Sequence, residues 1–377
     1  MIKDYNQVMK WIWQNNNWPQ FTYDENLFSD RMAEFRLTSE RLSGRIEALS
    51  GSNQNDAIID LLLSEAIKTS AIEGEILDRD SVRSSLLSLI NSDTLPPTND
   101  LKGAGAASLL VDVRKKWSQP LSHDLLGEWQ AMAVPEQRTS LILRGHYRTD
   151  PAPMQIVSGF YGRHKVHYEA PPAVQVMDEM NAFIDWYNKT SSQDKRSKLS
   201  GIIRAGIAHV WFETVHPFDD GNGRVGRAIA DHALSQSLGY PTLACLATAI
   251  ESKKKQYYQE LEQVGQGKLN LNKWLEYFTN AVIHAQSIAK EEVDFVLNKT
   301  RFYDRFADQL NERQAKVVER IFAEGRKGFE GELSTNNYMT IAKCPNRTAS
   351  RDLSDMLDKG IISKYGAGRS TRYELHL

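Results

Sequence analysis

Cysteine is almost absent from this chain of 377 residues, which contains only Cys245 and Cys344. Two thiols so far apart argue against a disulfide framework and favour a reducing compartment, with both side chains buried as small hydrophobic groups. Residues 1–5 lack the apolar core of a signal peptide, and no apolar run is long enough to cross a bilayer. We therefore expect a cytoplasmic protein without membrane contact.

An excess of either charge is also missing, because 46 Lys and Arg residues are balanced by 48 Asp and Glu residues. The chain as a whole thus has no attraction for nucleic acid or anionic lipid, and such binding would need a local basic patch. With 41% hydrophobic residues, a chain of this length can bury a substantial core divided over two or three domains.

Helical periodicity dominates the chain after an irregular, Trp-rich segment at residues 1–28. Apolar residues recur at helical spacing over residues 58–72, and Gly74 stands where this helix would end. Further helices are predicted at residues 97–117, 121–134, 174–186, 199–214, 222–238 and 254–263. The middle of the chain is therefore expected to be all-α.

Residues 145–172 interrupt this pattern with several glycines and prolines. Two short strand-like runs flank Gly162, and we interpret residues 155–168 as a β-hairpin inside the helical domain.

The last part of the chain has the element order of a winged helix-turn-helix. A charged helical connector after Ile288 leads to helices predicted at residues 312–324, 338–343 and 346–359, followed by strand-like runs at residues 361–364 and 371–375.

This tail is locally basic, which is compatible with a recognition helix and wing on DNA. Its basic residues are Lys343, Arg347, Arg351, Lys364, Arg369 and Arg372. However, Asp352, Asp355 and Asp358 are expected to interrupt the positive face, so DNA contact and protein contact both stay open.

Residues 216–227, with the sequence HPFDDGNGRVGR, join two predicted helices and have the composition of a phosphate site. Pro217 keeps His216 out of the helical conformation and leaves on a loop a side chain that accepts protons near neutral pH. Gly221 and Gly223 allow backbone N–H groups to turn toward an anion where the next helix begins.

Charged side chains complete this segment. Arg224 and Arg227 lie on one face of the next helix, in its first turn, where positive charge is unfavourable unless an anion compensates it. Asp220 supplies a carboxylate, as expected where Mg²⁺ bridges a carboxylate and nucleotide phosphates. Each residue alone fits a solvated turn or a surface ion pair, but their coincidence favours a site for phosphoryl or nucleotidyl transfer.

The segment resembles the signature His-Pro-Phe-x-(Asp/Glu)-Gly-Asn-Gly-Arg-x-x-Arg of the Fic (Fido-fold) family at every defined position. The resemblance implies a mainly all-α fold, with a helical core and a β-hairpin flap. It divides the chain into an N-terminal region with an inhibitory helix (residues 1–96), a Fic domain (97–287), a helical connector (288–305) and a winged helix domain (306–377).

The same resemblance implies that His216 takes the proton from a Ser, Thr or Tyr hydroxyl of a target protein, and that AMP is transferred from ATP while pyrophosphate leaves. Phe218 would anchor the loop, and Asp220 would hold Mg²⁺. The target would dock on the hairpin at residues 155–168 by strand addition. The implied nucleotide contacts are Gly221, Asn222 and Gly223 as the anion nest, Arg224 at the phosphates, Arg227 at the γ-phosphate, and Tyr257 and Tyr258 near the adenine.

Residues 69–74 resemble the inhibitory motif (Ser/Thr)-x-x-x-Glu-(Gly/Asn) of the family, with Thr69, Glu73 and Gly74 at its defined positions. Glu73 would pair with Arg227, occupy the γ-phosphate position and leave the α-phosphate out of line for attack. The plain alternative is a helix end capped by Gly74.

These observations predict an autoinhibited protein adenylyltransferase (AMPylator) that uses ATP and Mg²⁺ and also modifies itself. Alternatives are a nucleotide-sensing transcriptional regulator with little transfer activity, a de-AMPylase on the same site, and transfer of UMP or phosphate. The sequence leaves open the target, the activating signal and the oligomeric state, a homodimer included.

Overall fold

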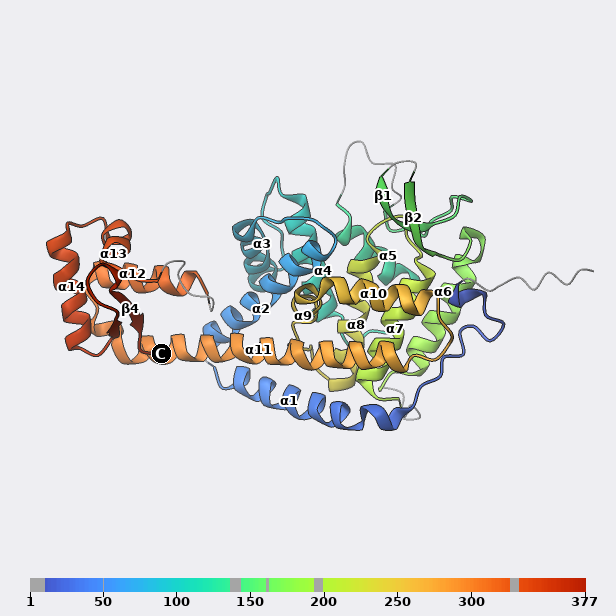
Figure 1. The fold of residues 1–377 in the computed structure, drawn as a ribbon, viewed down its shortest axis with the longest axis horizontal. Helices are drawn as coiled ribbons and strands as arrows, with labels where there is room; N and C mark the ends of the chain where they lie inside the picture. Colours follow the sequence, from blue (N-terminus) through green and yellow to red (C-terminus); the bar gives the residue numbers. More distant parts are fainter. Residues whose placement is uncertain (1–10, 50, 136–143, 161–162, 193–198, 326–331) are drawn as a thin grey trace, which may run out of the picture. The chain divides into compact units, whose positions relative to one another are not determined.

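The computed structural model describes residues 11–49, 51–135, 144–160, 163–192, 199–325 and 332–377. Within them the chain is mainly helical, with two small antiparallel hairpins (Figure 1), so the predicted fold class is confirmed. The chain forms two compact units, one of Met1–Gly44 with Ile58–Ala289 and the other of Arg45–Ala57 with Lys290–Leu377. None of the described helices combines the length and the hydrophobicity that a membrane span requires.

The first unit is built from helices joined by short turns. In chain order the helices as far as Phe306 are the 3-10 turns Ile12–Gln14 and Glu25–Phe28, then α1 (Ser29–Glu47), α2 (Gly51–Ile72), α3 (Arg79–Ser92), α4 (Leu101–Lys115), α5 (His123–Ala133), α6 (Ala173–Lys189), α7 (Gly201–Val215), α8 (Asn222–Leu238), α9 (Leu246–Ser252), α10 (Lys254–Gly265) and α11 (Asn272–Phe306). The charged connector predicted after Ile288 is the second half of α11, which runs without a break.

Helix α7 is the centre of the first unit. Every residue from Ile202 to Val215 is buried, as expected for a helix that is apolar on all sides. Its one buried guanidinium, that of Arg204, donates to the carbonyl oxygen of Tyr187 and to Oε1 of Gln236 at 2.8 and 2.9 Å, so burial leaves this charge paired with acceptors. The loop that begins at His216 follows directly after this buried helix.

The predicted hairpin is present. Strand β1 (Gln155–Phe160) pairs antiparallel with β2 (Arg163–Glu169), with Gln155 opposite Glu169 and a bulge between Ile156 and Val157. Gly162, which we placed at its turn, lies outside the described residues. Figure 1 shows the hairpin projecting from the helices of the first unit.

The Trp-rich N-terminal segment holds the base of this hairpin. Trp13 donates from Nε1 to the carbonyl oxygen of Glu169 at 2.8 Å, and the Trp11 ring meets the Tyr168 ring edge-on at 5.4 Å. The Tyr168 hydroxyl in turn donates to the carbonyl oxygen of Thr214 at 2.7 Å. The hairpin base is thus fixed near the end of α7.

The second unit has the predicted order of three helices and a hairpin. Its C-terminal elements are the 3-10 turn Ala307–Gln309, α12 (Glu312–Ala323), α13 (Thr335–Ala342), α14 (Asn346–Asp358), β3 (Ile362–Tyr365), the 3-10 turn Gly368–Ser370 and β4 (Arg372–Leu375). Strand β3 pairs antiparallel with β4, and the core forms around Val317, Phe322, Leu353 and Met356. This arrangement is compatible with a winged helix-turn-helix.

The expected acidic interruption of the positive face is wrong for Asp352. This residue is 4% exposed and accepts hydrogen bonds from Arg313 and from the Tyr338 hydroxyl, because the helical spacing directs it inward with Leu353 and Met356. Asp355 pairs with Lys359 at 2.7 Å, and Asp358 is exposed. The side chain of Arg369 lies outside the described residues.

Candidate nucleotide-binding and transfer site

The loop after α7 begins with a strained residue. His216 adopts a left-handed conformation with a φ of 49°, and its N–H donates to the carbonyl oxygen of Phe212 at 2.9 Å. Arg148 holds this geometry, donating from Nε to the carbonyl oxygen of His216 at 2.8 Å and from its backbone N–H to that of Pro217 at 2.9 Å. Sequence analysis did not identify Arg148, since the contact joins residues 68 positions apart and has no local pattern.

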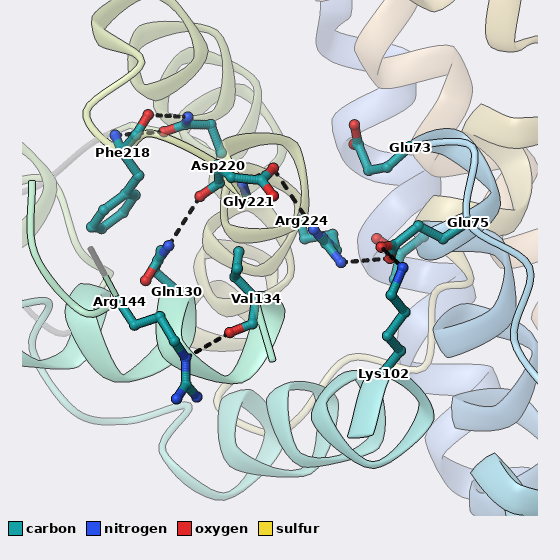
Figure 2. Close-up of polar contacts among 12 residues, drawn as sticks. Glu73, Glu75, Lys102, Gln130, Val134, Arg144, Phe218, Asp220, Gly221 and Arg224 are labelled. Atoms are coloured by element: carbon teal, nitrogen blue, oxygen red, sulfur yellow. Dashed lines mark hydrogen bonds and ion pairs between the residues drawn. The ribbon is translucent and has the colours of Figure 1, made fainter. Parts of the chain in front are cut away.

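Two side-chain contacts close the loop. Asn222 accepts from the N–H of Phe218 at 2.9 Å and donates to its carbonyl oxygen at 2.8 Å, while the Phe218 ring is fully buried. Gln130 on α5 donates to the carbonyl oxygen of Asp220 at 3.1 Å (Figure 2). The side chain of Asn222 therefore shapes the loop, and the loop is anchored on both sides.

The N-terminus of α8 opens toward a carboxylate. Gly221 caps the helix with a φ of 86° and without a side-chain hydrogen bond. A Cβ atom on Gly223 would lie 2.2 Å from Oε1 of Glu73, so only glycine permits this approach. Backbone N–H groups at a helix N-terminus favour an anion, and here the Glu73 carboxylate lies beside them.

Arg227 is held by the C-terminal end of α2. Its Nε donates to the Thr69 hydroxyl at 2.8 Å, and its Nη2 donates to the Thr69 carbonyl oxygen at 2.9 Å and to Oε1 of Glu73 at 2.8 Å. The structure thus brings Thr69, Glu73 and Arg227 together, as the sequence analysis predicts for an inhibitory contact.

A second carboxylate, which sequence analysis missed, lies on Arg224. Oε2 of Glu75 accepts from Nη1 of Arg224 at 2.7 Å, and Oε1 of Glu75 accepts from Nζ of Lys102 on α4 at 2.8 Å. Figure 2 shows the Glu75 side chain between these two cations, next to Glu73 on the same turn. Each arginine of the loop is therefore paired with one carboxylate from the end of α2.

Gly74 fixes the directions of both carboxylates. It has a φ of +82°, its N–H donates to the carbonyl oxygen of Ala71, and the N–H of Glu75 donates to that of Ser70. These are the two hydrogen bonds of a Schellman motif, which requires a left-handed residue at this position. The motif ends α2 and places Glu73 and Glu75 on either side of one glycine.

Both arginines keep buried donors that no protein acceptor satisfies. Among the described residues, neither Nε of Arg224 nor Nη1 of Arg227 has a hydrogen-bond partner. A buried guanidinium N–H without an acceptor is costly. These donors fit the oxygens of a polyphosphate, which accept several hydrogen bonds at once.

The protonation states suit proton transfer from a hydroxyl. Burial lowers the pKa of His216 to about 4, so its imidazole is neutral at pH 7 and able to accept a proton. Burial also acts on Glu73, but the Arg227 guanidinium outweighs it and holds the pKa of this carboxyl below its usual range. Glu73 is therefore an anion when it pairs with Arg227.

Three further acids near Arg227 escaped sequence analysis, since each lies on a helix with no distinctive neighbours. Burial raises the pKa of Glu213 to about 8 and that of Glu65 to about 7, the latter against hydrogen bonds from Thr248. Burial raises the pKa of Asp231 as well. These carboxyls surround a guanidinium that is itself only 2% exposed.

Asp220 is suitably placed for a metal ion that is shared with a nucleotide. Its side chain is 51% exposed, and its Oδ1 accepts from the N–H of Gly221 at 2.7 Å. Within the described residues, no group of three or more His, Cys, Asp and Glu side chains could hold a metal. The residues fit Mg²⁺ only if phosphate oxygens and water supply its other ligands, as is usual for this ion.

The two predicted adenine contacts differ. Tyr257 is buried and its hydroxyl lies 2.9 Å from Nε2 of His209, whereas Tyr258 is 41% exposed and donates to the carbonyl oxygen of Ile72 at 2.9 Å. Of these two residues, only Tyr258 is exposed. Its hydroxyl also ties α10 to the end of α2.

The fold and loop define a helical protein in which a glycine-rich loop leads into the N-terminus of a helix, a geometry that suits an anion. Residues 120–234 match the model of the Fic/DOC family, so the chain contains a Fic domain. Residues 11–90 match a domain of unknown function, DUF4172, and residues 330–376 match the C-terminal domain of DIP2311-like transcriptional regulators.

Several known proteins are similar to this chain. The chain is 30% identical over 155 residues to protein adenylyltransferase fic-1 of Caenorhabditis elegans, a match that covers 41% of this chain and 28% of that protein. A Fic family protein from Desulfovibrio desulfuricans has a similar fold, with a TM-score of 0.51 and 19% identity over 92% of this chain and 96% of that one. A Fic domain containing signaling protein from Bacteroides thetaiotaomicron also gives a TM-score of 0.51, with 16% identity over 70% of this chain and 97% of that one.

Proposed function

We propose that this chain transfers AMP from ATP to protein hydroxyl groups and that Glu73 restrains the reaction. The observation that carries the proposal is the pairing of Glu73 with Arg227 at 2.8 Å, in the cradle that begins with the neutral His216. The relative fic-1, which the chain matches over only part of its length, is named a protein adenylyltransferase. The name of this relative supports the choice of AMP.

The reaction is an in-line displacement at the α-phosphorus. The imidazole of His216 takes the proton of the target hydroxyl, the hydroxyl oxygen bonds to the α-phosphorus, and the bond from that phosphorus to the bridging oxygen of the β-phosphate breaks. Pyrophosphate leaves with the electron pair of that bond. The first turn of α8, Arg224 and Arg227 stabilise the charge, and Mg²⁺ on Asp220 would neutralise part of it when bound.

Glu73 prevents this geometry in the resting protein. Its carboxylate occupies the space beside Gly223 and Arg227 that a terminal phosphate requires, so ATP cannot place its γ-phosphate there while the pair persists. Removal of the carboxylate is expected to free the Arg227 guanidinium and the space beside Gly223.

The test is incorporation of label from ATP into the protein itself and into candidate targets. With α-³²P-ATP and Mg²⁺, we expect Glu73→Gly to label about 10-fold more than the wild type, an effect within the usual range of regulatory coupling. We expect His216→Ala in the Glu73→Gly background to lose about 100-fold or more of that labelling. γ-³²P-ATP should give no label, and mass spectrometry should find AMP on a hydroxyl side chain.

Asp185→Asn is the matched control, since Asp185 pairs with Lys189 at 2.7 Å in an exposed ion pair on α6. Equal labelling of the wild type and Glu73→Gly contradicts the brake. Label from γ-³²P-ATP would indicate phosphate transfer, preferential use of UTP would indicate UMP transfer, and loss of AMP from a modified protein would favour the de-AMPylase alternative. Each of the last three results would indicate a different reaction at the same loop.

The hairpin is the proposed docking site for the target segment. Along its second strand, Lys165 and His167 contact Glu262 of α10 at 2.9 and 3.1 Å, which ties β2 to the helical core. On β1, Ile156 and Val157 are 41% and 50% exposed. An extended peptide could therefore add beside β1, with backbone hydrogen bonds and apolar contacts to these two side chains.

A DNA-binding regulator is the second candidate function, favoured by the exposed face of α14. Because Asp352 points inward, this face carries Asn346, Arg347, Ser350, Arg351 and Ser354. Two arginines one helical turn apart suit phosphate and base contacts. The match to the C-terminal domain of DIP2311-like transcriptional regulators agrees with this reading.

A gel shift on duplex DNA over a range of salt concentrations tests this candidate. Binding that weakens with salt, and weakens further in Arg347→Ala with Arg351→Ala, would support it. Binding without salt dependence, or no shift at all, would leave protein contact as the role of this unit.

A further inference from the structure

We propose that the Glu75 carboxylate stands in for a second phosphate of the bound nucleotide, held between Arg224 and Lys102. Lys102 is then a phosphate ligand of the ATP site, and Glu75 is an inhibitory residue that acts beside Glu73. This inference rests on the proposed use of a nucleoside triphosphate.

In this geometry one anion, the Glu75 carboxylate, bridges two cations. One oxygen of Glu75 lies 2.7 Å from Nη1 of Arg224, and the other lies 2.8 Å from Nζ of Lys102. A phosphate group offers the same two-oxygen contact with more charge, so it can replace the carboxylate at both partners. Nε of Arg224 is a buried donor without a partner in the described structure, and the carboxylate leaves it unsatisfied.

Burial differs among the three side chains in a way that favours exchange. Arg224 is only 7% exposed and is therefore fixed, whereas Glu75 is 21% and Lys102 is 43% exposed. Glu75 can leave toward solvent, and the flexible stem of Lys102 can follow an incoming phosphate. If Glu75 stayed, its charge would repel any phosphate bound to Arg224.

The two inhibitory carboxylates lie on the same backbone turn. Glu73 and Glu75 flank Gly74 in one Schellman turn, and they pair with Arg227 and Arg224, which lie on one face of α8. A polyphosphate that spans both arginines must displace both carboxylates. Removing Glu73 alone therefore leaves the Arg224 side of the cradle occupied.

Lys102 belongs to neither of the matched family segments that surround it. The DUF4172 match ends at residue 90 and the Fic/DOC match begins at residue 120. We infer the role of Lys102 from its contact with Glu75, which places α4 beside the turn after α2.

The decisive experiment measures nucleotide affinity by calorimetry in the His216→Ala protein with Mg²⁺, so that turnover does not interfere. Adding Glu75→Gln should tighten ATP binding about 5-fold or more, and adding Lys102→Met to that variant should weaken it again by about the same factor. AMP, which lacks the β- and γ-phosphates, should change less than about 2-fold in each case. Lys102→Arg should retain the ATP affinity.

Asp185→Asn serves as the control for loss of an ion pair, and thermal melting checks folding of each variant. If Glu75→Gln melts early, Glu75→Asp replaces it, because the shorter side chain cannot bridge both cations. Unchanged ATP affinity in the Glu75 variants, or in Lys102→Met on the Glu75→Gln background, overturns the inference.

The outcome is separable from that of the proposed function. If Glu73→Gly transfers AMP but Glu75 and Lys102 leave ATP affinity unchanged, only this inference fails. If ATP affinity depends on Glu75 and Lys102 while no variant transfers AMP, the phosphate site stands and the proposed transferase activity fails.

Discussion

Two carboxylate–arginine pairs in this protein differ in which partner is buried and in whether all hydrogen-bonding atoms of that partner are paired. In the second unit, Asp352 is 4% exposed and accepts hydrogen bonds from Arg313, Tyr338 and Asn311, so its oxygens are saturated. In the first unit, it is Arg227 that is buried, with its Nη1 lacking a partner in the described structure, while Glu73 remains partly accessible. A saturated pair stabilises a fold, whereas a pair with a spare buried donor can exchange one anion for another.

The largest effect is expected from breaking the saturated pair. Asp352→Ala should lower the free energy of unfolding of the second unit by about 2 kcal/mol, since it leaves the buried Tyr338 hydroxyl without its acceptor. All eight Trp residues lie at position 274 or before, in the first unit. The loss should therefore appear in unfolding followed by far-UV circular dichroism and not in tryptophan fluorescence. An equal shift in both signals would contradict the division of roles.

The exchangeable pair should give the reverse result. Glu73→Gln should raise AMP transfer about 10-fold while the free energy of unfolding changes by less than about 1 kcal/mol, because the Gln amide oxygen can still accept from Arg227 and the Thr69 contacts remain. Labelling with α-³²P-ATP and tryptophan-detected unfolding check the two parts. A loss of stability as large as that of Asp352→Ala would make Glu73 a structural residue.

The pH dependence of transfer sharpens the same contrast. The pKa of His216 is lowered to about 4 with Glu73 present, so its neutral form persists above that value, and transfer by Glu73→Gly should not fall until the pH is below about 4. Glu73 favours the charged form of His216, so its removal should move the inflection to lower pH. An inflection near the ordinary histidine pKa would show that His216 is solvated in the active state. The measurement is the single-turnover rate from about pH 3.5 to about pH 7 at constant ionic strength.

The smallest effect is expected at the glycine between the two inhibitory carboxylates. Gly74→Ala meets no atom within 4 Å but keeps a φ of +82°, which costs an alanine about 1 kcal/mol. The strained turn should loosen both carboxylates and raise transfer by a smaller factor than Glu73→Gln. Gly239→Ala is a matched control, since Gly239 ends α8 with a φ of +81° and also has open space around it. A similar gain in the control would remove the special role of Gly74.

Local patterns in the chain are enough to predict the parts of the site that depend on near neighbours. Pro217 and the glycines at 221 and 223 dictate how the loop leaves α7 and enters α8, and periodicity predicts the helices on either side. The inhibitory turn is equally local, since its hydrogen bonds join residues three and five positions apart. Family resemblance supplied the expected roles of these residues, and the choice of AMP remains a proposal.

The distant groups that meet this loop follow from helix packing and not from local patterns. Arg148 reaches His216 across 68 positions, Glu75 reaches Arg224 across 149, and Lys102 has no local signal that distinguishes it from any other helical lysine. The inward direction of Asp352 likewise depends on which face of α14 packs on the core. Local preferences act within a few residues of the chain, whereas these contacts exist because burial of apolar side chains brings separate helices together.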